Sequence, residues 1–362
     1  MRLTVRRPKI RLVLLFIGIV ALLLIILFVV ATFRHLGLPD PTGRFGVGKT
    51  HVTWHDTSRP EDSSANPNDS RELPLQIWYP SDEADGEKAA YIPNLSTISD
   101  GLKEAGEVNW VAAWALRYVR THAYPAAPVS GTSARYPVVV FSPGNSSNLE
   151  FYSSYLEDLA SHGYIVVGIN HPYDVAAVEL SDGTVAVIPP LGATPDQDRT
   201  ASRVEVRKLD ILYVLDHLGD LNAGSSVLEG RLDTGQVVAA GHSLGGIAAS
   251  QACVVDSRFK GCLNLDGLQD GGPFSVRRGE SIPSQAFRLI TKESTWLPAT
   301  QRLVESVPNA SFTLIPGAEH QSFSDSPLFG PTLNPFKTSA GNTNGLVRAS
   351  ILEFIRATLP IR

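Results

Sequence analysis

Residues 237–246 read VVAAGHSLGG, and this stretch decides the fold. An apolar run typical of a buried strand leads directly into Gly241-His242-Ser243-Leu244-Gly245, and a run of small residues follows at 247–252. The G-x-S-x-G pattern places a serine on a sharp turn between a strand and a helix, where the flanking glycines relieve crowding. Ser243 is therefore the candidate nucleophile.

Strand-like and helix-like segments alternate along the chain around this turn. Helices are expected at 149–161, 203–218, 247–252 and 345–357. Strand, helix, strand at this spacing implies parallel pairs joined by crossover helices, so we predict an α/β fold with a mostly parallel eight-stranded sheet and helices on both faces. The expected strands are Val47–His55, Leu73–Tyr79, Tyr136–Phe141, Tyr164–Ile169, Val237–Ala240, Gly261–Leu265, Ala286–Ile290 and Ser311–Ile315.

A serine hydroxyl is a weak nucleophile at neutral pH and needs an imidazole to take its proton. His320 is the candidate base, because it lies in a loop rich in helix breakers beyond the last expected strand. His171, at a strand end, is the rival, and we interpret it as a wall or hydrogen-bonding residue. His242, next to the serine in sequence, is interpreted as a packing residue whose ring points away from the hydroxyl.

The third member of such a site is an acid that holds the far nitrogen of the imidazole. Asp266 ends the segment GCLNLD, which is the first strand to end after the serine, and Glu293 after the next strand is the runner-up. A tetrahedral oxyanion also needs two backbone donors. We expect them to be the N–H of Leu244, at the start of a helix, and the N–H of Asn145, in a loop that also reads as a plain turn.

Composition excludes several classes of protein. The 362 residues are 43% hydrophobic and 19% charged, with two cysteines, so disordered, collagen-like and disulfide-scaffold classes are excluded. Five of the 31 basic residues lie in the first eleven positions, so the 36 acidic residues outnumber the basic ones in the rest of the chain. A body this acidic repels phosphate backbones, so we expect no nucleic-acid partner.

The N-terminus predicts a membrane anchor. Leu12–Phe33 runs without a charge, and 22 helical residues reach roughly 33 Å, enough to cross a hydrocarbon core. The basic flank at 1–11 should stay in the cytoplasm, which places the remainder on the extracytoplasmic side. A cleaved signal peptide remains the alternative and would give a secreted protein. A tether at 34–45 and one catalytic domain at 46–362 follow.

Three smaller signals complete the interpretation. Trp110, Trp114 and Tyr118 share a helical spacing, which fits core packing or a surface that touches lipid or lines the site entrance. Cys253 and Cys262 could form a disulfide or stay buried thiols. No cysteine and histidine spacing suggests zinc, no acidic loop suggests calcium and no glycine-rich phosphate loop occurs, so we expect no metal or cofactor.

The chain resembles the platelet-activating factor acetylhydrolase family, in its plasma and intracellular type II branch. The resemblance rests on YPVVVFSPGNSSNLEFYSSYLEDLASHGYIV, GHSLGG, DSRFKGCLNLDG and PGAEHQSFSD, and covers most of residues 73–325. It implies an α/β-hydrolase fold and calcium-independent cleavage of short or oxidised acyl groups from the sn-2 position of glycerophospholipids. Ser243, Asp266 and His320 would be the triad, and the amides of Leu244 and Asn145 the oxyanion donors.

The same resemblance puts membrane-contacting helices at Trp110–Val119. Two positions depart from the family, since Pro143 stands where it often has histidine and Leu244 where it often has phenylalanine. The substrate therefore stays open, because bacterial polyester hydrolases share the GHS-x-GG elbow. A cutinase-like or general carboxylesterase is the alternative, and a non-catalytic binding protein of the cell surface is a remote one.

Overall fold

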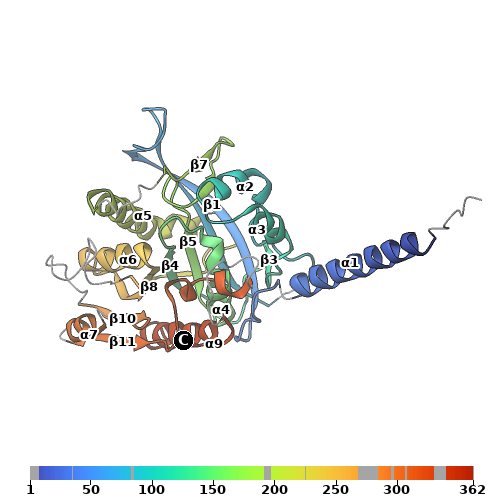
Figure 1. The fold of residues 1–362 in the computed structure, drawn as a ribbon. Helices are drawn as coiled ribbons and strands as arrows, with labels where there is room; N and C mark the ends of the chain where they lie inside the picture. Colours follow the sequence, from blue (N-terminus) through green and yellow to red (C-terminus); the bar gives the residue numbers. More distant parts are fainter. Residues whose placement is uncertain are drawn as a thin grey trace, which may run out of the picture.

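A nine-stranded sheet forms the centre of the protein (Figure 1). The computed structural model describes residues 8–34, 36–82, 85–190, 197–224, 226–267, 284–294, 297–305, 308–329 and 340–361. The sheet order is β11-β10-β9-β8-β4-β5-β2-β1-β3, and a separate pair is formed by β6 and β7. The strands are β1 (Gly46–Pro60), β2 (Ser70–Ser81), β3 (Ala123–Pro125), β4 (Tyr136–Ser142), β5 (Ile165–Ile169), β6 (Ala177–Glu179), β7 (Val185–Val187), β8 (Leu232–His242), β9 (Phe259–Leu265), β10 (Ala286–Thr291) and β11 (Ala310–Leu314).

Six neighbouring strands run in the same direction. Strands β5, β4, β8, β9, β10 and β11 pair in parallel, whereas β2 is antiparallel to both β5 and β1. The carboxyl ends of the six parallel strands therefore lie along one edge of the sheet, and the loops that follow these strands meet there.

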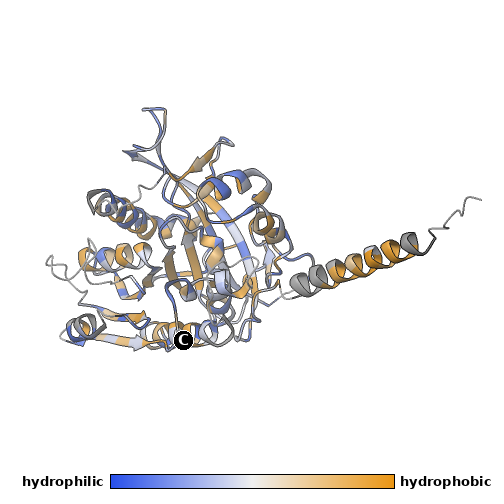
Figure 2. Ribbon diagram, in the orientation of Figure 1, coloured by the Kyte–Doolittle hydropathy of each residue, from blue (hydrophilic) through white to orange (hydrophobic). Residues whose placement is uncertain are grey.

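Helices cover both faces of the sheet. Alternate side chains of each buried strand point to opposite faces, so Val139 and Val166 pack with α4 and α9 whereas Val138 and Val140 pack with α5 and α6. Figure 2 shows apolar strands in the centre of the body and helices with both polar and apolar residues around them. The helices are α1 (Pro8–Arg34), α2 (Leu95–Glu104), α3 (Trp110–Ala115), α4 (Ser153–Ser161), α5 (Gln197–Ala223), α6 (Leu244–Val255), α7 (Leu297–Glu305) and α9 (Ala340–Thr358), with 3₁₀ turns η1 (Leu116–Tyr118), η2 (Leu149–Tyr152), η4 (His320–Phe323) and η5 (Ser326–Phe329).

The sequence predicts eight strands, whereas the sheet has nine within the described residues. The eight expected strands form, and the ninth strand, β3, pairs in parallel with residues 47–49 of β1. It has only three residues and contains a proline, so it carries no periodicity that sequence could reveal. The α/β architecture with a mostly parallel sheet is as predicted.

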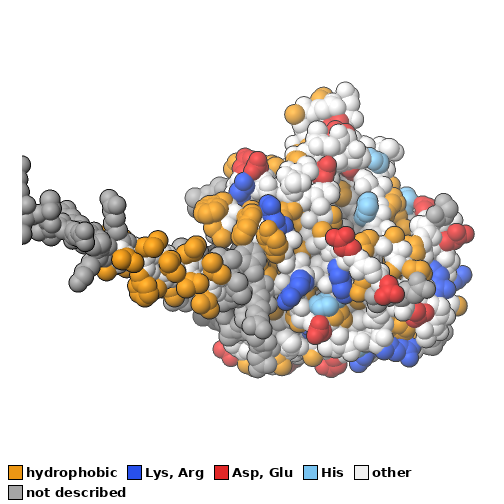
Figure 3. Space-filling model, turned by 90° about the vertical axis from the view of Figure 1, so that its right-hand side faces the viewer, with side chains coloured by type: hydrophobic (Ala, Val, Ile, Leu, Met, Phe, Trp, Pro, Cys, Tyr) orange, Lys and Arg blue, Asp and Glu red, His pale blue; other side chains and the backbone are white. Residues whose placement is uncertain are grey.

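The N-terminal helix α1 extends from the body of the protein in Figure 1. Its described apolar side chains are exposed, for example Leu12 at 65% and Leu24 at 62%, as Figure 3 shows along the helix. Within the described part of the chain, however, no helix is both long enough and apolar enough to cross a membrane. The transmembrane helix predicted at Leu12–Phe33 therefore has no support from the structure, and most of the basic flank at 1–11 lies outside the described residues.

The aromatic stripe at Trp110–Val119 has a buried side and an exposed side. Ala115 and Leu116 are buried, whereas the side chains of Trp110, Trp114 and Tyr118 are exposed. The rings of Trp114 and Tyr118 touch edge to face, with centroids 5.3 Å apart. Core packing therefore accounts for only half of the stripe.

A disulfide joins Cys253 in α6 to Cys262 in β9, one of the two states that the sequence allowed. Both residues are fully buried and lie nine positions apart in the sequence. A bridge at this separation stabilises the folded protein by roughly 2–3 kcal/mol in the chain-entropy estimate. The bridge ties the far end of the helix that follows Ser243 to the strand that leads to Asp266.

Candidate active site

Ser243 lies at the turn where β8 ends and α6 begins. Its backbone has φ 52° and ψ −120°, a region that non-glycine residues rarely adopt and that stores strain. Glycine is required on both sides, because a side chain at Gly241 would overlap the backbone of Gly245, and one at Gly245 would overlap the carbonyl of Ser142. These contacts also show that the elbow packs directly against the end of β4.

The structure brings Ser243, His320 and Asp266 into one hydrogen-bonded line. The Nε2 atom of His320 lies 3.0 Å from the Ser243 hydroxyl oxygen, and its Nδ1 atom lies 2.6 Å from Oδ2 of Asp266. The Asp266 side chain is 2% exposed, whereas that of His320 is 33% exposed at the start of η4. A buried acid thus fixes the ring, and an accessible ring faces the hydroxyl.

Each member comes from the carboxyl edge of the sheet. Ser243 follows β8, Asp266 follows β9, and His320 follows β11. Asp266 also has a positive φ of 51°, and its N–H donates to the carbonyl of Ile290 at 2.8 Å. Glu293, the runner-up for the acid, is exposed and is not the carboxylate that contacts the imidazole.

Thr291 is a member of this site that the sequence did not point to. Its hydroxyl donates a hydrogen bond to Oδ1 of Asp266, the carboxylate oxygen that His320 does not use. Thr291 ends β10, so the same rule of strand ends that suggested Asp266 would have placed it at this edge. With both oxygens engaged, the carboxylate is held in one orientation.

His242 and His171 occupy the supporting positions expected of them. His242 is buried, its Nδ1 lies 2.8 Å from the Tyr152 hydroxyl, and its ring centroid is 4.7 Å from that of His320. Burial and the neighbouring His320 hold the pKa of His242 well below its usual value, so the ring stays neutral. His171 bonds Ser142 and Asp210 with its two nitrogens, at 2.9 and 2.7 Å, and contacts neither Ser243 nor His320 in the bonds described.

The two expected backbone donors come from the start of α6 and from the loop after β4. Leu244 is the first residue of α6, and its N–H lies before the first helical hydrogen bond, which runs from Ile247 N to Ser243 O at 3.1 Å. Asn145 is exposed in the loop after β4. The start of this loop lies beside the elbow, because a side chain at Gly245 would overlap the carbonyl groups of Ser142 and Pro143. Among the described residues no group of histidine, cysteine or carboxylate side chains could hold a metal ion.

Asp325 anchors the segment that carries His320. It is fully buried and accepts hydrogen bonds from the Ser154 N–H and from the Tyr91 hydroxyl, both at 3.2 Å. Its own N–H donates to Phe151 O at 2.6 Å. Burial raises the pKa of Asp325 to about 7.

Comparison with known proteins agrees with this architecture. The α/β hydrolase family model matches residues 139–341, and the model for platelet-activating factor acetylhydrolase, isoform II, matches residues 30–187. The chain therefore belongs to the α/β hydrolase family. Within this family, the model match over residues 30–187 and the named relatives support a hydrolase of the platelet-activating factor acetylhydrolase type.

The relatives and a solved structure are similar over most of the chain. The platelet-activating factor acetylhydrolase of Canis lupus familiaris is 25% identical over 83% of this chain and 70% of its own length. A protein of Arthroderma benhamiae described as "Probable 1-alkyl-2-acetylglycerophosphocholine esterase" is 24% identical over 80% of this chain and 76% of its own length. The structure of a ferulic acid esterase from Streptomyces cinnamoneus has a TM-score of 0.69, 26% identity, and covers 91% of this chain and 94% of its own.

The raised pKa of Asp325 predicts a pH-dependent stability. In the unfolded chain an aspartate has a pKa of about 3.9, so between that value and about 7 only the folded protein holds this proton. The stabilisation is complete below pH 3.9 and is lost as the pH rises through 7. Compared with Asp325→Asn, the wild type should lose roughly 2–4 kcal/mol of unfolding free energy between pH 5 and pH 8 in urea titrations.

The control is Asp62→Asn, which changes an exposed aspartate. Its curve should run parallel to that of the wild type across the same pH range. A parallel curve for Asp325→Asn as well would show that the buried carboxyl does not take up a proton on folding.

Proposed function

We propose that Ser243 forms an acyl-enzyme in this carboxylic ester hydrolase. The observation that carries the proposal is the continuous line of hydrogen bonds from the Ser243 hydroxyl through His320 to Asp266. In that geometry His320 Nε2 takes the proton of the hydroxyl as the oxygen attacks an ester carbonyl. Asp266 accepts the hydrogen bond of the other ring nitrogen, Nδ1, and so keeps this nitrogen protonated. It also stabilises the imidazolium.

The same groups complete both halves of the reaction. In the first half His320 gives its proton to the departing alkoxide, the ester bond to the leaving group breaks, and the acyl group stays on Ser243. In the second half a water molecule, deprotonated by His320, attacks the acyl carbon; the bond to the Ser243 oxygen then breaks, His320 returns the proton to that oxygen, and the carboxylate leaves. In both halves the N–H groups of Leu244 and Asn145 would receive the negative oxygen of the tetrahedral intermediate.

The substrate we propose first is the sn-2 acyl group of phospholipids that resemble platelet-activating factor. Two curated relatives support it, since one is named a platelet-activating factor acetylhydrolase and the other a 1-alkyl-2-acetylglycerophosphocholine esterase.

A second candidate is a general or cutinase-like carboxylesterase. The ferulic acid esterase structure favours it, because an esterase with another type of substrate in its name shares this fold at 26% identity. The two candidates share the chemistry at Ser243 and differ in the alcohol that leaves.

We also propose that residues 12–33 anchor the protein in the cell membrane, with the catalytic domain outside the cytoplasm. The charge-free sequence and the basic residues before it support the orientation. The high exposure of apolar side chains such as Leu12 and Leu24 calls for an apolar environment around α1.

Replacing the nucleophile tests the chemistry. Ser243→Ala should lower kcat/KM for p-nitrophenyl acetate by about 10⁴-fold or more, and Asp266→Asn by about 10⁴-fold because the imidazole then loses its correct tautomer. A fluorophosphonate should label the wild type at Ser243 and leave Ser243→Ala unlabelled. Ser257→Ala, which changes an exposed serine just after the same helix, is the matched control and should keep its activity.

Retained turnover in Ser243→Ala would refute the acyl-enzyme. A wild type that neither hydrolyses esters nor reacts with the fluorophosphonate would instead revive the non-catalytic binding protein.

A panel of esters separates the two substrate classes. The account predicts a higher kcat/KM for 2-acetyl phospholipid than for feruloyl ester or polyester film, with a steep fall as the acyl chain of p-nitrophenyl esters lengthens. Faster turnover of the feruloyl ester or the polyester than of the phospholipid would assign the general esterase.

Fractionation of cells tests the anchor. The full chain should stay in the membrane pellet after an alkaline carbonate wash and be cut by protease added outside, whereas a variant without residues 1–45 should be found in the soluble fraction. Full-length protein in the soluble cytoplasmic fraction would contradict the proposed location.

A further inference from the structure

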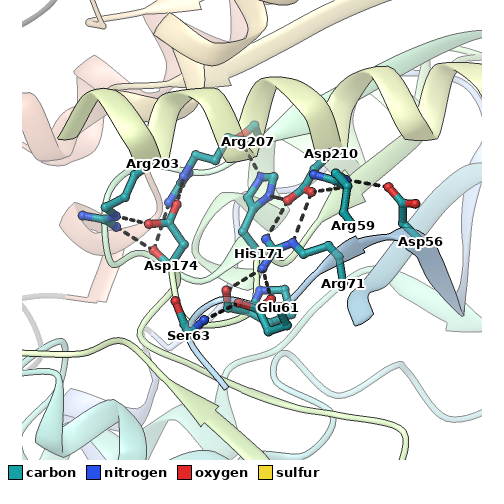
Figure 4. Close-up of polar contacts among 12 residues, drawn as sticks. Asp56, Arg59, Glu61, Ser63, Arg71, His171, Asp174, Arg203, Arg207 and Asp210 are labelled. Atoms are coloured by element: carbon teal, nitrogen blue, oxygen red, sulfur yellow. Dashed lines mark hydrogen bonds and ion pairs between the residues drawn. The ribbon is translucent and has the colours of Figure 1, made fainter. Parts of the chain in front are cut away.

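Arg207 extends from α5 towards Asp174 (Figure 4). Its guanidinium also contacts the loop that carries Asn145. Its side chain is fully buried, with 0% exposed. One terminal nitrogen, Nη1, donates to the carbonyl of Pro143, and the other, Nη2, donates to the carbonyl of Gly144 at 3.2 Å. The guanidinium therefore holds two successive carbonyl groups of the loop after β4.

Two contacts with Asp174 hold the guanidinium in place. Arg207 Nε donates to Oδ2 of Asp174, and Nη2 donates to the carbonyl of the same residue at 3.0 Å. Arg203 contacts the other oxygen of that carboxylate, Oδ1, as Figure 4 shows. Burial alone would raise the pKa of Asp174, but the two arginines lower it, so the carboxylate stays charged.

The geometry of the peptide bond determines the direction in which the N–H of Asn145 points. In a planar trans peptide, the carbonyl and the N–H point in opposite directions. The peptide between Pro143 and Gly144 follows this rule, since its carbonyl faces Arg207 while its N–H donates to the Tyr152 hydroxyl at 2.9 Å. In the next peptide the carbonyl of Gly144 faces Arg207, so the N–H of Asn145 points away from the guanidinium.

Without this contact the second peptide would have more freedom. Gly144 has no side chain to restrict it, and the packing there requires glycine, because a Cβ would come within 2.9 Å of both His242 Nδ1 and the Tyr152 hydroxyl. A rotation of the peptide between Gly144 and Asn145 would replace the N–H by a carbonyl oxygen, which repels an oxyanion.

We propose that Arg207 is a positioning residue that locks the Gly144–Asn145 peptide with its N–H facing the oxyanion of the reaction. The proposal rests on the proposed function and deepens it, because it names the group that prepares one of the two donors before the substrate arrives. Arg207 itself touches no reacting atom.

A second buried contact fixes the start of the same loop. The Ser142 hydroxyl bonds His171 Nε2 at 2.9 Å, and His171 Nδ1 bonds Asp210 at 2.7 Å. Burial lowers the pKa of His171 to about 4, so near pH 7 the neutral ring can donate through Nδ1 and accept through Nε2. Arg71 pairs with the same Asp210 at 2.6 Å. With the end of β4 held in this way, Arg207 acts on the two residues that follow.

The test compares Arg207→Lys with a matched arginine elsewhere. Lysine keeps the charge beside Asp174 but lacks the planar fork that bridges two carbonyls. We expect kcat to fall about 10²-fold, as when one oxyanion donor is lost, with KM within about twofold of the wild type. The affinity for a trifluoromethyl ketone, whose adduct carries the oxyanion, should fall by the same factor as kcat/KM.

Arg231→Lys is the control. Arg231 also holds two loop carbonyls, those of Ser130 and Ser133, but in the loop before β4, away from Ser243. It should lower the melting temperature and leave kcat unchanged. Asp174→Asn is the second variant, which keeps Arg207 and weakens its orientation, and we expect a fall of about tenfold in kcat.

Crystal structures of the wild type and Arg207→Lys give a readout that does not depend on turnover. The proposal predicts that the Gly144–Asn145 peptide is rotated or in two orientations in the variant only. An unrotated peptide with unchanged kcat, or a loss of kcat matched by Arg231→Lys, would overturn the role of Arg207 while the chemistry at Ser243 stands. Unchanged activity of Ser243→Ala would instead overturn the proposed function. The orientation of the Gly144–Asn145 peptide in the two crystal structures would still decide the role of Arg207.

Discussion

The site depends on the backbone of one residue, Ser243, held at φ 52° between a strand and a helix. Such a conformation costs about 1–3 kcal/mol and persists only where the surroundings determine it. Here its N–H donates to Leu265 O at 2.8 Å, and the glycines at 241 and 245 allow the chain to approach the end of β4. The fold stabilises this turn, and the turn lifts the hydroxyl above the sheet towards His320.

Buried ion pairs fix the backbone of the loop next to the hydroxyl. Ion pairs such as Arg207 with Asp174 and Arg71 with Asp210 bring little net stability, because removing charges from water costs several kcal/mol per ion. What these pairs offer is one definite arrangement of the backbone they hold. They converge on Ser142, Pro143 and Gly144, the residues that precede the proposed donor at Asn145.

Sequence predicted the parts of this molecule that depend on local pattern. The apolar strands, the elbow at Ser243 and the strand ends at Asp266 and beyond follow from periodicity and glycine spacing. Sequence missed β3, which is too short to have a period, and the contact of Thr291 with Asp266. It also missed Arg207, which sits in an ordinary helical pattern. The carbonyl groups that it holds, those of Pro143 and Gly144, are more than 60 residues away and become visible only when the loops meet in space.

The most direct test is a crystal structure of the wild type after reaction with a fluorophosphonate. The phosphorus should be bonded to the Ser243 oxygen, and the phosphoryl oxygen should lie about 3 Å from the backbone nitrogens of both Leu244 and Asn145. An adduct on any other residue, or a phosphoryl oxygen that points away from both nitrogens, would contradict the account.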